Sequence, residues 1–87
     1  MDAYSLEIRR SAAQELDAVE PRAQRLRIVA RIRALASDPH PPGAQKLAGS
    51  RSAFRIRQGD YRVVYEILET ERRIVIVKIG HRREVYR

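Results

Sequence analysis

The sequence has no cysteine and no apolar run long enough to cross a bilayer. Without cysteine, neither a disulfide framework nor a thiolate metal site can stabilise the fold. The longest apolar runs are short ones such as IVIV at residues 74–77, and the N-terminal stretch MDAYSLEIRR contains no apolar signal segment. We therefore expect a soluble, cytoplasmic protein that is not attached to a membrane.

The length of 87 residues allows one domain with a single modest core. The chain contains no internal repeat, low-complexity tract or domain linker. We therefore expect residues 1–87 to form one domain.

Positive charge is concentrated in the C-terminal part of the chain. The formal net charge is +7, and 16 of the 18 basic residues are arginine. Residues 1–50 carry eight basic and six acidic side chains, whereas residues 51–87 carry ten and five. Since guanidinium groups bind phosphate with two parallel hydrogen bonds, this distribution predicts a polyanionic partner, either nucleic acid or an acidic protein.

The spacing of apolar residues predicts the element order β-α-α-β-β-β. Residues 3–9 alternate as a half-buried strand does, and two helices follow over residues 11–19 and 21–36. Ser11 and Gln14 form a capping-box pattern at the start of the first helix. A proline-rich connecting loop at residues 37–45 precedes strand-like runs at residues 53–58, 61–68 and 72–79. This order predicts an α+β fold, a small antiparallel-dominated sheet with two helices packed on one face.

The segment FRIRQGDYRVVYE, residues 54–66, is typical of a β-hairpin. A two-residue turn at Gly59 and Asp60 would pair Arg57 with Arg62 and place both, with Arg55, on the outer face. Like charges opposite each other on a sheet repel, so this cluster indicates a surface that binds phosphate. The alternative is that the arginines are ordinary solvated charges on an exposed strand. Three further residues are candidates for phosphate binding: Lys46, Arg51 and Arg83.

The C-terminal stretch GHRREVYR, residues 80–87, supplies a second group of candidates. We expect Gly80 to end the last strand and the tail to fold back beside the hairpin. His81 and Tyr86 could then move protons, and Arg82 could stabilise charge on a phosphoryl oxygen. Together with Arg55, Arg57 and Arg62, those groups are the parts needed for RNA cleavage without a metal, although a single histidine is more often an ordinary surface residue.

Two segments, KLAGSRSAFRIRQGDYRVVYEI and IVKIGHRREVYR, resemble the RelE/ParE superfamily of toxins from type II toxin–antitoxin systems, on its RelE side. The resemblance covers nearly the whole chain. It implies a compact α/β fold, an acidic RelB-like antitoxin that wraps the chain, and no cofactor. It also implies an mRNA interferase, an endoribonuclease that cleaves mRNA in the ribosomal A site and inhibits translation.

The resemblance also assigns residues. By position, Arg62, Arg82 and Tyr86 match the catalytic residues of RelE-type enzymes, whereas Arg55 and Arg57 stand where the well-known enzyme has two lysines. Arginine stays protonated, so neither residue suits general-base catalysis.

A substitute base is therefore expected elsewhere, with His81 as the first candidate and Glu84 as the second. The implied reaction is attack of the ribose 2′-OH on the adjacent phosphate. Two other functions stay open: a ParE-like toxin that inhibits DNA gyrase by binding, and a non-catalytic basic module that binds nucleic acid.

Overall fold

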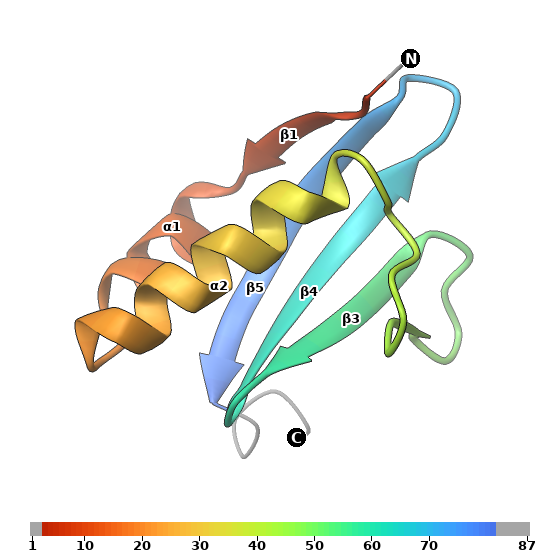
Figure 1. Cartoon of the computed structure of the whole chain (residues 1–87). Helices are drawn as coiled ribbons and strands as arrows, with labels where there is room; N and C mark the ends of the chain where they lie inside the picture. Colours follow the sequence, from red (N-terminus) through yellow and green to blue (C-terminus); the bar gives the residue numbers. More distant parts are fainter. Residues whose placement is uncertain (1–2, 82–87) are drawn as a thin grey trace.

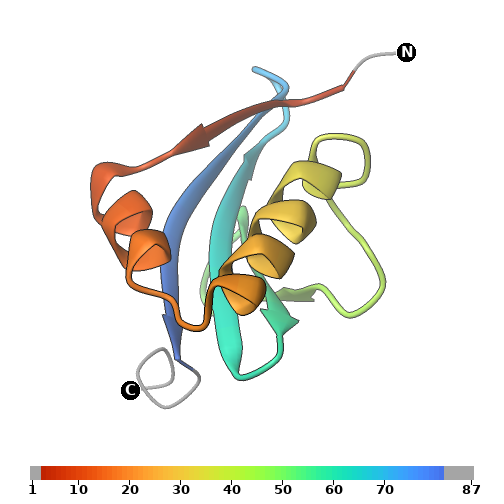
Figure 2. The ribbon, with the colours of Figure 1, turned by 60° about the vertical axis from the view of Figure 1, so that its left-hand side comes forward.

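The computed structural model describes residues 3–81, which form a five-stranded sheet with both helices on one face (Figure 1, Figure 2). In chain order the elements are β1 (Ser5–Ile8), α1 (Arg10–Asp17), α2 (Arg22–Leu35), β2 (Gln45–Lys46), β3 (Ala53–Gln58), β4 (Tyr61–Leu68) and β5 (Arg73–His81). The strand order is β1-β5-β4-β3-β2, in which β1 is parallel to β5 and the other neighbours are antiparallel. The prediction of an antiparallel-dominated α+β fold is confirmed.

The β3–β4 hairpin has the predicted register. Arg57 pairs with Arg62 and Gln58 pairs with Tyr61, across a turn at Gly59 and Asp60. Gly59 has a φ of +62°, a conformation that glycine adopts without steric cost. The local turn residues, with Ile56, Val63 and Tyr65 on one face, therefore suffice to fix this register.

The hydrophobic core lies between the helices and one face of the sheet. A β-bulge helps to fill it, because Tyr65 pairs with Ile76 whereas Val64 pairs with Lys78, which leaves one extra residue in β5. The extra residue shifts the alternation, so that Ile76 and Ile79 both face the core. The buried cluster consists of Ala12, Val19, Ile28, Ile32, Leu35, Ile56, Val63, Tyr65, Ile67, Ile74, Ile76 and Ile79.

The start of α1 differs from the prediction. The helix begins at Arg10, its N-cap is Arg9, and no side chain caps it, so the predicted capping box at Ser11 is wrong. Arg9 donates its backbone N–H to the carbonyl oxygen of Ile76 at 3.0 Å. Pairing with β5 therefore leads directly into the helix, and this tertiary contact determines where α1 begins.

Three strand predictions also need correction. Gly80 does not end the last strand, since β5 continues to His81. The proline-rich loop leads into a further short strand, β2, which begins at Gln45. β1 is exposed along its whole length rather than half-buried, because it is an edge strand that pairs only with β5.

A buried hydrogen bond ties β4 to the loop after α2. The Tyr65 hydroxyl donates to the Pro39 carbonyl oxygen at 2.8 Å, and burial raises the pKa of Tyr65 to about 12. The Tyr65→Phe variant should lose about 1 kcal/mol of unfolding free energy, because the Pro39 carbonyl keeps its burial but loses its donor. Equilibrium denaturation in urea measures the loss.

The matched control is Tyr4→Phe, which removes a hydrogen bond of 2.6 Å to Glu69 at an exposed site and should cost less. The raised pKa adds a second readout. Ionisation favours the unfolded chain, so the Tyr65 contribution is complete below pH 10 and decreases as the pH rises towards 12. A Tyr65→Phe protein that is as stable as the wild type would contradict this account.

Candidate nucleic-acid interface

The three hairpin arginines line one hollow on the face of the sheet that lies opposite the helices. Arg55, Arg57 and Arg62 surround about 350 Å³ together with Gly43 and Gln45. Side chains alternate across a strand, so these arginines face away from the core residues between them. We call this hollow the arginine pocket.

The three arginines differ in depth. Arg57 is exposed and Arg55 is half-buried, whereas only 8% of Arg62 is exposed. The prediction that all three lie on the outside is therefore wrong for Arg62. The reason is that β4 lies between two long strands, and Arg62 pairs with Arg57 on one side and Gly80 on the other.

Burial has an electrostatic consequence for Arg62. A charge in a low-dielectric environment attracts an anion more strongly than a solvated charge does. The arginine pocket therefore combines a deep guanidinium group with two that are accessible at its rim. This geometry suits one phosphate group with its oxygens directed at the pocket base.

The sequence alone did not indicate Gln45 and Gly43. Gln45 pairs with Arg55, and its side-chain oxygen accepts a hydrogen bond from the Arg55 guanidinium. Gly43 also lines the pocket, and its φ of +90° is a conformation that favours glycine. A strand of two residues shows too little alternation to be recognised in a sequence.

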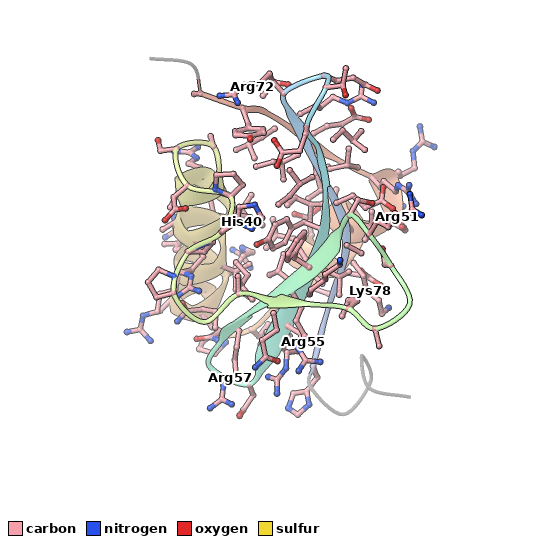
Figure 3. All side chains as sticks on the ribbon, turned by 90° about the vertical axis from the view of Figure 1, so that its right-hand side faces the viewer. His40, Arg51, Arg55, Arg57, Arg72 and Lys78 are labelled. Atoms are coloured by element: carbon pink, nitrogen blue, oxygen red, sulfur yellow. The ribbon has the colours of Figure 1, made fainter. Side chains whose placement is uncertain are left out.

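The remaining phosphate-binding candidates lie elsewhere. Arg51 lines a different hollow, and Figure 3 shows it well apart from Arg55 and Arg57. Lys46 is exposed and follows Gln45 in β2, so its side chain points to the other face. Four residues lie outside the described part of the chain, namely Arg82, Arg83, Glu84 and Tyr86.

The structure does not bring His81 into the arginine pocket. His81 pairs with Tyr61, and the two rings meet edge to face with their centroids 5.8 Å apart. Since the neighbouring pair is Arg62 with Gly80, His81 points to the face opposite Arg62. His81 is therefore not grouped with the hairpin arginines, because β5 continues through Gly80 and keeps its alternation.

A helix side chain fixes the hairpin turn. Gln24 of α2 donates from Nε2 to the Gln58 carbonyl oxygen at 2.8 Å. The turn that joins the two arginine-bearing strands is thereby held against the helical layer.

The Gly59→Ala variant should disturb this anchor. A Cβ at residue 59 would lie 2.3 Å from Gln24 Nε2, and the positive φ adds roughly 1–2 kcal/mol of backbone strain. The Gln24→Ala control loses only the hydrogen bond, about 1 kcal/mol. Urea denaturation of both variants and the double variant should give losses that are less than additive, because removing Gln24 relieves the clash. Fully additive losses would contradict the contact.

Two further findings concern residues 3–81 only. In that range, no three acidic or histidine side chains are grouped in a way that could hold a metal ion. Neither helix in the same range is long and apolar enough to span a membrane.

Comparison with known proteins gives a consistent result. Residues 6–86 match the family model described as the ParE toxin of the type II toxin–antitoxin system parDE. No curated protein matches the chain.

Several solved structures share the fold. The archaeal RelE–RelB complex from Pyrococcus horikoshii OT3 matches with a TM-score of 0.78 and 26% identity over 92% of this chain and 96% of that one. The RelBE2 toxin–antitoxin complex from Mycobacterium tuberculosis matches with a TM-score of 0.77 and 23% identity, over 91% of this chain and 98% of that one. The isolated E. coli RelE toxin matches with a TM-score of 0.77 and 20% identity, over 91% of this chain and 84% of that one.

Proposed function

We propose that this chain, which belongs to the ParE toxin family of type II toxin–antitoxin systems within the RelE/ParE superfamily, inhibits translation by cleaving mRNA in the ribosomal A site. The observation that supports this most is the arginine pocket, in which Arg62 lies at the base and Arg55 and Arg57 lie nearer the solvent. An inhibitor that acts only by binding needs no buried cation at the bottom of a phosphate-sized hollow.

The proposed reaction is an internal transfer of the phosphodiester. The ribose 2′-oxygen forms a bond to the adjacent phosphorus and loses its proton, the bond from phosphorus to the 5′-oxygen breaks, and that oxygen takes up a proton. The products are a 2′,3′-cyclic phosphate and a free 5′-OH. Negative charge grows on the phosphoryl oxygens during attack, and Arg62 would stabilise it from the pocket base.

Other residues complete the proposal. Arg82 would share the phosphoryl charge with Arg62, and His81 and Tyr86 would move the two protons. Because His81 lies on the other face at the end of the sheet, this role requires the scissile phosphodiester to lie at that end, within reach of both His81 and the arginine pocket. Arg55 and Arg57 would hold the phosphate in place, since arginine does not act as a base.

We also propose that a cognate acidic antitoxin neutralises this toxin. RelE relatives are found in complexes with RelB antitoxins. On the helical side, a mainly apolar hollow of about 230 Å³ is lined by Leu6, Ile8 and Val29, and its two charged lining residues are Glu7 and Arg33. An amphipathic acidic segment would cover this apolar surface and pair with the arginine.

Brief expression followed by mapping of mRNA 5′ ends tests the nuclease proposal. New ends should appear inside coding regions within A-site codons, and they should disappear when ribosomes are stalled at initiation. Purified ribosomes programmed with one mRNA should reproduce the same ends. Cleavage of naked mRNA at the same rate would contradict dependence on the ribosome.

A ParE-like function is the second candidate, since the matching family model is that of the ParE toxin. It predicts gyrase-dependent DNA damage with intact mRNA. Expression in cells that carry a toxin-resistant gyrase separates the two, because only a gyrase inhibitor should become harmless there.

A further inference from the structure

A second hollow lies on the helical side at the same end of the sheet as the arginine pocket. The β3–β4 turn and the end of β5 meet at this end (Figure 1, Figure 2). The hollow has a volume of about 420 Å³ and is lined by Glu15, Ala18, Val19, Tyr61, Ile79, Gly80 and His81. The paired rings of Tyr61 and His81 form an aromatic wall, and the aliphatic side chains give the hollow apolar surfaces. Such a site fits a flat aromatic group better than a peptide backbone.

One polar group in this hollow is held in a fixed position. The Oε1 atom of Glu15 accepts the backbone N–H of Ile79 at 2.8 Å, and its Oε2 atom accepts the ammonium group of Lys78 at 3.0 Å. A carboxylate has about four acceptor positions, so each oxygen can accept one more hydrogen bond. The hollow therefore presents two adjacent acceptors beside an aromatic wall.

We propose that this hollow binds a guanine base of the RNA, an inference that rests on the proposed nuclease function. Guanine is the common base whose Watson–Crick edge carries two adjacent donors, the N1–H and the 2-amino group, which match the two free acceptor positions of Glu15. Uracil has one donor between two carbonyl oxygens, and those oxygens would be repelled. Protein recognition of single-stranded RNA commonly combines stacking on aromatic rings with hydrogen bonds to base edges.

The position of the hollow fits one RNA strand in both sites. Tyr61 lines the hollow and Arg62, the next residue, lines the arginine pocket on the other face. A nucleotide chain that bends around the end of the sheet would keep its phosphate with the arginines and place a base beside Tyr61. An acidic peptide is disfavoured here, because carboxylates would repel it. Glu15 lines this hollow, and Tyr61 also lines a neighbouring hollow that contains Glu20 and Asp60.

Binding of short RNA to the full-length protein tests the inference. Trinucleotides with a 2′-deoxy sugar at the scissile position cannot be cleaved, and they would carry guanine, hypoxanthine or adenine at one position. By isothermal titration, guanine should bind roughly tenfold more tightly than adenine, the scale of one good base contact. Hypoxanthine lacks the 2-amino group and should fall between the two.

Protein variants identify the group responsible. Glu15→Gln should remove the preference for guanine, because an amide presents one donor and one acceptor. Asp17→Asn, at an exposed carboxylate on the same helix, should keep the preference. Tyr61→Leu should weaken all three ligands alike, because stacking does not depend on base identity.

Two results would overturn the inference: equal affinity for guanine and adenine in the wild type, or a guanine preference that survives in Glu15→Gln. The hypoxanthine comparison needs no protein variant, so misfolding cannot obscure it. Guanine-selective binding by a protein that never cuts mRNA on ribosomes would refute the nuclease proposal alone. Ribosomal cleavage with equal trinucleotide affinities would refute this inference alone.

Discussion

The Arg62→Ala variant should cleave mRNA on programmed ribosomes roughly 10²–10³-fold more slowly than the wild type in a single turnover. This is the scale observed when one preorganised donor is removed from a developing charge. Arg62 is 8% exposed at the base of the arginine pocket, where little water competes for the phosphoryl oxygens. Ribosome affinity should change much less, because many exposed arginines remain to hold the complex.

Two comparisons make this result specific. Arg62→Lys keeps the charge but loses the planar fork, so its rate should fall between those of the wild type and the alanine variant. Arg22→Ala removes an exposed arginine at the start of α2, on the helical side of the sheet, and should cleave at the wild-type rate. Equal losses of rate and affinity in Arg62→Ala would show that Arg62 only binds RNA.

The sequence predicted the hairpin correctly because its determinants are local. Alternation from Ala53 to Gln58 and from Tyr61 to Leu68, with glycine at the turn, allows one register that buries the apolar face. The same reasoning correctly placed the three arginines on one side. It could not give their depth, which depends on strands that are distant in the sequence.

The parts that were not predicted depend on such distant contacts. Arg62 is buried because Gly80 continues the ladder beside it, and α1 begins where the Ile76 carbonyl receives the Arg9 N–H. The role of Gln45 depends on a two-residue strand that exists only because β3 pairs with it. In each case the local pattern indicated another result, and pairing between distant segments determined the outcome.

The separation of His81 from Arg62 illustrates the same point at the candidate site. Glycine commonly interrupts strands, so a break at Gly80 was the reasonable local interpretation. Because β5 continues instead, alternation places His81 beside Tyr61 and the helices. One residue of strand extension therefore places His81 and the hairpin arginines in two hollows on opposite faces.

Removing both arginines nearer the solvent should affect RNA affinity rather than rate. In the Arg55→Ala/Arg57→Ala variant, affinity for single-stranded RNA should fall roughly 10²-fold, at about 1.5 kcal/mol for each lost charged contact. The salt dependence should weaken as well, because each phosphate contact contributes about −0.7 to the slope of log K against log salt. Two lost contacts should reduce that slope by about 1.4, whereas the cleavage rate at saturating RNA should change little.

The double exchange to lysine is the matched control, because it keeps both charges and stands where the resemblance to RelE-type enzymes has lysines. Its salt slope should equal that of the wild type, since counterion release depends on charge rather than on guanidinium geometry. Its affinity should fall only modestly, because Gln45 orients the Arg55 guanidinium and would not hold a lysine in the same way. A wild-type salt slope in the double alanine variant would mean that RNA does not contact Arg55 and Arg57, and the phosphate would then have to bind elsewhere. Fluorescence anisotropy titrations between 50 and 200 mM salt, a range over which phosphate contacts weaken binding measurably, distinguish these outcomes.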